Sequence, residues 1–218
     1  LMGEGGYVVP TPGFLAGVQE ICREHGILLI ADEVQSGFGR TGKWFGFQHF
    51  GVEPDIVIMA KALASGFPLS GIAARAELMR HSPPGSQGGT YGGNAVSCAA
   101  AVATLGVMQD EGLIENSAAK GARLLEKLEG LQDRFAAIGE VRGLGLMVGV
   151  EFTTASGEPD TATAKAVIQE CLERGLVLLS CGTYSNVIRW IPPLVIDDSH
   201  LDEALAIFVK ALEAGTAA

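Results

Sequence analysis

The sequence predicts an α/β protein in which helices alternate with strands buried in a sheet. Two short apolar runs, residues 27–31 and residues 55–60, are typical of strands covered on both faces. A helical pattern precedes the first run, and a glycine-punctuated loop lies between the two runs. Helix, buried strand, loop and buried strand in this order indicate an open and mostly parallel sheet.

Composition excludes several other classes of protein. Of the 218 residues, 48% are hydrophobic and 18% are charged, which is typical of a globular chain with one large or two small domains. The net charge of −10 and the lack of a basic block argue against nucleic-acid and anionic-membrane partners. Four scattered cysteines without metal-type spacing predict reduced thiols, a cytoplasmic location and no metal site.

Local signals place the helices of the first half of the chain. Thr11-Pro12 predicts a helix start with the threonine as N-cap, and Gly26 is placed to end that helix. Small apolar residues over 94–108 predict a tightly packed, buried helix. Residues 113–130 carry apolar side chains at helical spacing and predict an amphipathic helix.

The pattern changes near residues 106–112, and we place a domain boundary there. Residues 1–108 form the predicted first domain, and residues 109–218 form a smaller α/β domain. The elements expected in the second domain are strands at 141–152, 176–180 and 186–191, a helix at 160–174, and a final helix to about residue 214.

A carboxylate and an amine follow the two apolar runs of the first domain. Asp32 comes directly after the first run, and Lys61 directly after the second. The carboxyl ends of parallel strands border the crevice in which ligands bind, so the two side chains should face one crevice. The pair by itself fits two interpretations equally, a structural ion pair or an active site.

A pyridoxal phosphate enzyme needs both groups at once. A lysine holds the cofactor aldehyde as a Schiff base, and an acid keeps the pyridine nitrogen protonated, so that the ring accepts electrons from the substrate. Two neighbouring strand ends at the floor of a crevice suit both requirements. This favours the active-site interpretation and pyridoxal 5′-phosphate as the cofactor.

The surrounding residues resemble a known family. IADEVQSGFGRTG (30–42) and DIVIMAKALASGFPLSG (55–71) are similar to the cofactor segment of the class III pyridoxal-phosphate aminotransferases. The likeness also covers GEGG, GGTYGGN, VRGLGLM and LLSCGTYSNVIRW, and is greatest to bacterial 4-aminobutyrate aminotransferases. It implies the C-terminal part of the fold type I PLP-transferase large domain, followed by a smaller α/β C-terminal domain.

The resemblance implies roles for five cofactor residues. Lys61 matches the Schiff-base lysine and Asp32 the partner of the pyridine nitrogen. Val34 matches the residue packed on one face of the ring, and Gln35 the glutamine near its phenolic oxygen. Thr90 matches the threonine that binds the cofactor phosphate of the neighbouring subunit, which implies a homodimer. Without the family, Thr90 would be read as a turn residue between glycines.

The resemblance also implies two substrate residues. Arg189 matches the arginine that grips the α-carboxylate of glutamate or 2-oxoglutarate, although its position alone favours a solvated strand face. Glu4 matches the glutamate that pairs with this arginine when the substrate lacks an α-carboxylate. Together they imply transamination from an ω-amino donor, 4-aminobutyrate foremost, to 2-oxoglutarate, giving succinate semialdehyde and glutamate.

Three alternatives stay open. The first is an ornithine or acetylornithine aminotransferase, because these relatives share the cofactor motif. Family members are about twice this length, so we expect this chain to match their C-terminal half and to be incomplete as an isolated enzyme. The second alternative is therefore that the chain is catalytically incomplete and acts as a non-enzymatic assembly module. A nucleotide-binding α/β protein is the third alternative, but the sequence has no dinucleotide fingerprint.

Overall fold

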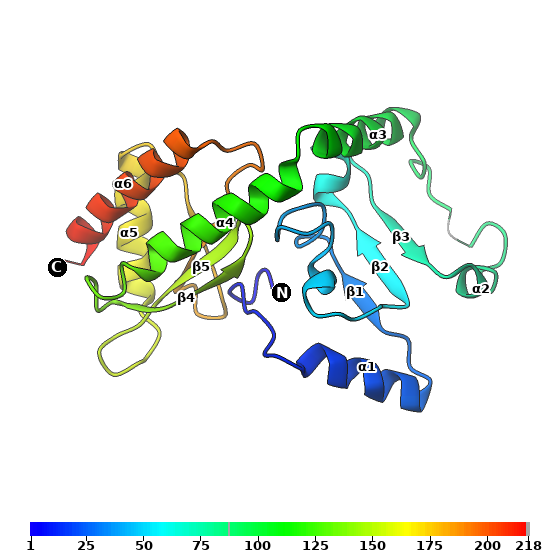
Figure 1. The fold of residues 1–218 in the computed structure, drawn as a ribbon, viewed down its shortest axis with the longest axis horizontal. Coiled ribbons are helices and arrows are strands. Elements are labelled where there is room, and N and C mark those ends of the chain that lie inside the picture. The colour runs from blue at the N-terminus through cyan, green and yellow to red at the C-terminus, as the bar shows by residue number, and fades with distance from the viewer. Residues whose placement is uncertain (87, 217–218) are drawn as a thin grey trace. The chain divides into compact units, whose positions relative to one another are not determined.

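The computed structural model describes residues 1–86 and 88–216 and has a mixed α/β architecture (Figure 1). The chain divides into two compact units. One unit is Pro10–Ile114, and the other combines Leu1–Val9 with Glu115–Ala218. The first nine residues therefore pack with the second half of the chain, which no sequence pattern indicated. The domain boundary placed between residues 108 and 109 stays a prediction.

The unit Pro10–Ile114 contains a sheet with the strand order β1-β2-β3. Strands β1 and β2 are parallel, as expected, and β3 is antiparallel to β2. The strands are β1 Ile30–Asp32, β2 Ile56–Met59 and β3 Gly71–Ala74. The helices are α1 Phe14–His25, η1 Gly46–His49, η2 Lys61–Ala64, α2 Ala76–Met79 and α3 Ala95–Asp110.

Three sequence expectations for this unit are wrong. Helix α3 is not buried, because among the described elements it packs mainly against η2, and Val102 is 71% exposed. Strand β1 is not covered on both faces, because Ile30 is 52% exposed. In the described part of the chain β1 is an edge strand, so its side chains have fewer neighbours than those of a central strand. Thr11 is not the N-cap of α1: Gly13 is, with φ +83°, and the Phe14 amide donates to the Thr11 carbonyl at 3.1 Å. Proline followed by glycine at positive φ favours this turn over a helix start. Gly26 ends the helix as predicted.

The second unit contains an antiparallel sheet with the strand order β4-β5-β7-β6. Its strands are β4 Ile138–Leu144, β5 Met147–Phe152, β6 Leu179–Cys181 and β7 Val187–Trp190. Its helices are α4 Leu113–Glu129, α5 Thr161–Glu173 and α6 Asp198–Gly215, of which α5 and α6 lie side by side (Figure 1).

The two faces of this sheet have different partners. Alternate residues along β5 and β7, such as Val150 and Ile188, belong to the core that the helices cover. The residues between them, such as Met147 and Val187, form a second small cluster around the fully buried Tyr7. The period of two along each strand thus gives one face to the helices and the other to the N-terminal residues.

No helix in residues 1–86 and 88–216 is long and apolar enough to cross a membrane.

A close approach between α4 and the sheet of the second unit predicts a difference between two glycine substitutions in their effect on stability. A Cβ atom at Gly121 of α4 would lie 2.1 Å from the Gly145 carbonyl carbon, so Gly121→Ala must push the helix away from the sheet. We expect a loss of about 2 kcal/mol or more in the free energy of unfolding, measured by urea denaturation. Gly130→Ala is the control, because its Cβ would meet only ordinary contacts at 3.5 Å and beyond. Equal effects of the two changes would contradict this packing.

Candidate active site

Asp32 and Lys61 lie at the carboxyl ends of two neighbouring parallel strands. Asp32 is the last residue of β1 and is in register with Ile58 of β2, three residues before Lys61. The Glu33 amide continues the pairing by donating to the Ile58 carbonyl at 3.0 Å. Both functional side chains therefore leave the sheet at the same edge, which is where α/β sheets bind ligands.

The backbone at Lys61 is strained. Its φ is +44°, a left-handed value that residues other than glycine rarely adopt. Lys61 begins η2, which packs against α3 beyond the carboxyl end of β2 (Figure 1). Packing of this kind, with Ala64 of η2 fully buried, can hold a strained residue, and such residues cluster at functional sites.

The structure separates the two interpretations of the Asp32–Lys61 pair. In the described part of the chain no ion pair joins the two side chains, and both are exposed. Asp32 Oδ1 instead accepts a hydrogen bond from the Val34 amide at 3.0 Å, which turns the chain into the following loop. The geometry thus does not support a structural ion pair. It leaves a carboxylate and an amine at one sheet edge, both open to a ligand.

Glu33 is a residue that the sequence analysis did not single out. Its side chain is 3% exposed and its two oxygens accept three hydrogen bonds, from Ser36 Oγ at 2.6 Å, the Gly46 amide at 2.9 Å and the Phe47 amide at 2.8 Å. The last two bonds satisfy amides at the start of η1, as a capping carboxylate does. Glu33 therefore ties the loop that carries Val34 and Gln35 to a segment more than ten residues later.

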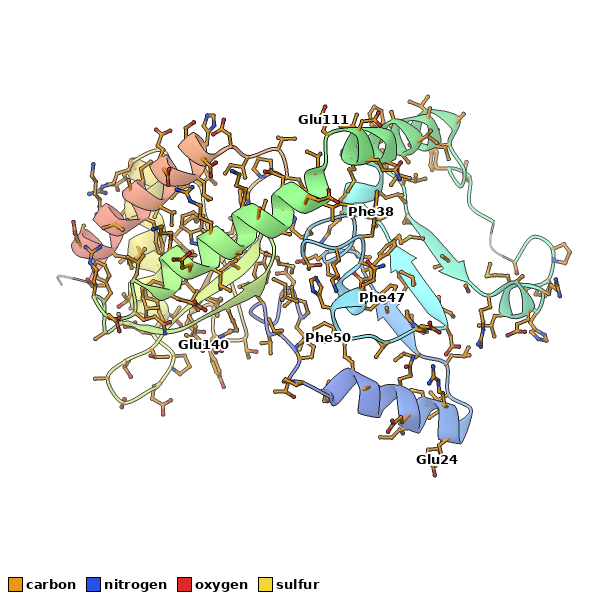
Figure 2. The ribbon with its side chains drawn as sticks, viewed as in Figure 1. Glu24, Phe38, Phe47, Phe50, Glu111 and Glu140 are labelled. Carbon is orange, nitrogen blue, oxygen red and sulfur yellow. The ribbon has the colours of Figure 1, made fainter. Side chains whose placement is uncertain are left out.

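Three aromatic rings reinforce the same loop. The rings of Phe38 and Phe45 are 5.5 Å apart edge to face, and those of Phe45 and Phe47 are 5.7 Å apart and stacked. Figure 2 labels Phe38 and Phe47 in this part of the molecule. Val34 and Gln35 are half-buried between these anchors, so the loop presents them from a fixed backbone.

Thr90 lies in the loop before α3 and is exposed. Asn94 caps that helix, accepting hydrogen bonds from the amides of Val96 and Ser97 at 3.1 Å each. The cap fixes the end of the loop but does not show what Thr90 binds. Its role toward a neighbouring subunit stays a prediction.

The structure brings Glu4 and Arg189 together in the second unit. Arg189 Nη1 donates to Glu4 Oε1 at 2.8 Å. The arginine side chain is 18% exposed, whereas that of the glutamate is 69% exposed. Burial disfavours the charged form of Arg189, but the hydrogen bond and charge of Glu4, aided by Tyr7 and Cys181, raise its pKa above the usual value. Arg189 therefore stays a cation that is ready to take a carboxylate.

The thiol beside this pair adds no charge. Cys181 is buried, and burial raises the pKa of its thiol to about 11. The described residues contain no group of three His, Cys, Asp or Glu side chains that could hold a metal ion. The candidate functional residues are Asp32 and Lys61 in one unit, and Glu4 and Arg189 in the other.

Comparison with known proteins identifies the family. The sequence model of aminotransferase class-III matches residues 1–212. The chain belongs to the class-III aminotransferases. The 5-aminovalerate aminotransferase DavT of Pseudomonas aeruginosa is 44% identical over 215 residues, which are 98% of this chain and 50% of the relative. The 4-aminobutyrate aminotransferase GabT of Escherichia coli is 40% identical over 215 residues, again 98% and 50%.

Solved structures share the fold. A Bacillus anthracis aminotransferase has a TM-score of 0.91 at 35% identity, covering 98% of this chain and 50% of that one. The ornithine delta-aminotransferase of Plasmodium falciparum has a TM-score of 0.90 at 36% identity, covering 99% and 55%. The chain spans about half the length of the relatives it matches. The fold is thus half of the fold of these transaminases.

Class-III aminotransferases use pyridoxal 5′-phosphate, and the residues of this chain fit that cofactor. The cofactor needs an amine for its aldehyde and an anion for its ring nitrogen. Lys61 and Asp32 supply these two groups, exposed and at one sheet edge, and they are not joined to each other by an ion pair. The loop held by Glu33 presents an apolar side chain, Val34, and an amide, Gln35, directly after the acid.

Glu33→Gln tests the structural role of the buried carboxylate. An amide has one acceptor oxygen and an NH2 group that would face the amides of Gly46 and Phe47, so charge-assisted bonds are lost. We expect a loss of about 2 kcal/mol in the free energy of unfolding. Glu24→Gln makes the same charge change at an exposed position of α1 (Figure 2) and should change stability little. If the two substitutions cost the same, Glu33 does not hold the loop.

Proposed function

We propose that this chain is the C-terminal half of an enzyme that transfers an amino group from an ω-amino acid to 2-oxoglutarate. The full-length enzyme here means this chain joined to the residues that match the other half of its relatives. In the reaction, 4-aminobutyrate gives up its amino group and becomes succinate semialdehyde, while 2-oxoglutarate exchanges its keto oxygen for that amino group and becomes glutamate. The Glu4–Arg189 pair is the observation that carries this choice of substrates.

When bound, pyridoxal phosphate supplies an electron sink for the carbanion that forms at the substrate carbon. Asp32 would hold the proton on the ring nitrogen, and Lys61 would hold the aldehyde carbon until the amino donor replaces it. Val34 would pack on one face of the ring, and Gln35 would lie near its phenolic oxygen. Thr90 would contact the cofactor phosphate of a second copy, so the active enzyme is a homodimer.

Lys61 also moves the proton of the reaction. With its amine free, Lys61 Nζ would take the proton from the substrate carbon and hold it for delivery later in the reaction. The Lys61 side chain extends from a strained backbone position, which the packing of η2 on α3 holds in place. A fixed backbone limits the search of a long, flexible side chain, which supports repeated proton transfer.

Arg189 and Glu4 determine which substrate can bind. Arginine takes a carboxylate with two parallel hydrogen bonds, which suits the α-carboxylate of 2-oxoglutarate and glutamate. An ω-amino donor has no carboxylate at that carbon, and a free guanidinium would then be left unpaired beside it. With Glu4 on Arg189, as the structure has it, the cation is neutralised and the donor can bind. With Glu4 turned away, Arg189 is free for 2-oxoglutarate.

The donor class follows from this exchange. Two of the relatives named above, DavT and GabT, act on 5-aminovalerate and 4-aminobutyrate by their names, and both molecules are unbranched ω-amino acids. Ornithine carries an α-carboxylate as well as an ω-amine, so its transfer places different demands on Arg189. A panel of these donors with the full-length enzyme separates the ω-amino acids from ornithine, and a preference for ornithine would refute 4-aminobutyrate as the donor.

The unpaired cysteines of the described chain favour the cytoplasm as its compartment.

The non-enzymatic alternative has its own test. The isolated chain can be mixed with pyridoxal phosphate, and the absorption band of a lysine-bound cofactor can be sought. A band supports cofactor binding by these residues. A well-folded circular dichroism spectrum without a band would favour an assembly role for the isolated chain.

Lys61→Ala should abolish covalent attachment of the cofactor. Borohydride reduction of the full-length enzyme, followed by peptide mass analysis, should label the peptide that contains Lys61 in the unmodified protein only. The transamination rate should fall by a factor of roughly a hundred or more. Lys43→Ala is the control, because Lys43 donates to the Gln48 carbonyl in the neighbouring loop and should keep both label and activity. A label that persists in Lys61→Ala would overturn the assignment.

Glu4→Ala should separate the two half-reactions of the full-length enzyme. Loss of the carboxylate leaves Arg189 unpaired when an ω-amino donor binds, so the 4-aminobutyrate half-reaction should slow by about tenfold in single-turnover kinetics, as expected for one charge-assisted bond. The glutamate half-reaction should change much less. Glu203→Ala, at an exposed site on α6, is the matched control. Equal losses in both half-reactions would refute the exchange.

A further inference from the structure

A row of residues crosses the β4-β5-β7-β6 sheet on the face opposite its helices. Arg142 of β4 is in register with Gly149 of β5, and Gly149 is in register with Arg189 of β7. Two arginines therefore flank a glycine. A Cβ atom at Gly149 would lie 3.2 Å from the Tyr7 Cβ and 3.5 Å from the Gly6 carbonyl oxygen. The N-terminal loop, residues 3–7, thus lies over the glycine and between the two arginines.

Arg142 fastens the backbone of the N-terminal loop. Its Nε and Nη2 both donate to the Gly6 carbonyl oxygen, at 3.0 and 2.7 Å. Its Nη1 donates to Glu140, labelled in Figure 2, at 2.6 Å and also to Glu151. The Arg142 side chain is 12% exposed, so these charge-assisted bonds form largely out of water, where they are strongest.

The backbone conformation of the N-terminal loop leaves room for the Arg142 side chain at Gly6. Gly6 has φ +107°, and a Cβ atom there would lie 3.2 Å from Arg142 Nη2, so a larger residue would be strained and crowded. The Gly182 amide donates to the Glu4 carbonyl at 2.9 Å. Tyr7 is fully buried. The backbone is therefore held at Glu4 and on its C-terminal side, while the Glu4 carboxylate remains mostly exposed.

Arg142 and Arg189 form ion pairs with different carboxylates. Glu140 and Glu151 both pair with Arg142, and Asn186 Nδ2 donates to Glu151 Oε1 at 3.3 Å, which helps to orient that carboxylate. The positive charge of Arg142 is thus balanced by Glu140 and Glu151. The ion pair of Glu4 is made with Arg189, on the opposite side of the glycine.

We propose that Arg142 is a positioning residue for the Glu4–Arg189 pair, a role that rests on the donor–acceptor exchange proposed above. By holding the Gly6 carbonyl, Arg142 fixes the point from which the Glu4 side chain reaches Arg189. Rotation of one side chain is then enough to make or break the pair. The 2-oxoglutarate carboxylate displaces only that side chain, and the loop keeps its place for the next ω-amino donor.

The test is a double-mutant cycle in the full-length enzyme. The quantity measured is the ratio of the single-turnover rate constants for 4-aminobutyrate and for glutamate. Arg142→Met should lower this ratio by about fivefold, less than Glu4→Ala, because the loop is loosened but the carboxylate is still present. In the Glu4→Ala background, Arg142→Met should lower the ratio no further. Arg134→Met is the control, because Arg134 pairs with Glu213, away from the loop.

The outcomes distinguish this inference from the proposed function. If Glu4→Ala lowers the ratio but Arg142→Met slows both half-reactions equally, or its effect on the ratio adds fully in the double variant, Arg142 is only structural. If Glu4→Ala leaves the ratio unchanged, the exchange itself fails, and the positioning role fails with it. If Arg142→Met does not fold, Arg142→Lys decides in the same way, because lysine keeps the charge but cannot donate twice in a planar fork.

Hydrogen exchange gives a readout that does not depend on activity. Amide exchange of residues 3–7 should be faster in Arg142→Met and in Arg142→Lys, and unchanged in Arg134→Met. Unchanged exchange in both Arg142 variants would overturn the proposal, even if their rates changed.

Discussion

The Glu4–Arg189 pair depends on how the N-terminal loop crosses the four-stranded sheet. Gly149 lets residues 3–7 lie close to the strand, because a Cβ atom there would be only 3.2 Å from the Tyr7 Cβ. The loop places Glu4 against Arg189, 185 residues later in the chain. The exposed carboxylate and the half-buried guanidinium have unequal freedom. The arginine is fixed on a strand, while the glutamate can turn away, and this asymmetry is what an exchange between two substrates requires.

A second constraint places Asp32 and Lys61, the proposed catalytic pair. Because β1 and β2 are parallel, their carboxyl ends lie at the same edge of the sheet. Strand β1 ends at Asp32, and β2 is followed by Lys61. The loop after Asp32 is held by the buried Glu33 carboxylate and by stacked aromatic rings. The turn at Lys61 is held by the packing of η2 on α3. Rigid strands and anchored turns thus present an acid and an amine at fixed positions, as a cofactor with two attachment points requires.

Local patterns in the sequence were enough for the parallel pair and for the placement of Asp32 and Lys61. They missed the exposure of β1 and the turn that divides residues 141–152 between β4 and β5. Apolar runs and the residues that end them are local properties, and the family resemblance added Glu4 and Arg189. The contacts of Glu33 and Arg142 were not predictable in this way. The Gly6–Arg142 bonds join residues 136 positions apart, and no periodicity records such a pairing. The Thr11 cap failed because proline and glycine favour a turn at that point.

The most direct test of the central claim is a pair of crystal structures of the full-length enzyme with pyridoxal phosphate, one with 4-aminobutyrate and one with 2-oxoglutarate. The account predicts that the Glu4–Arg189 distance stays near the 2.8 Å seen here with the ω-amino acid. With 2-oxoglutarate, Arg189 should bind the α-carboxylate through two hydrogen bonds and Glu4 should point away, while the Gly6 carbonyl remains on Arg142. An unbroken Glu4–Arg189 pair in both structures would contradict the account.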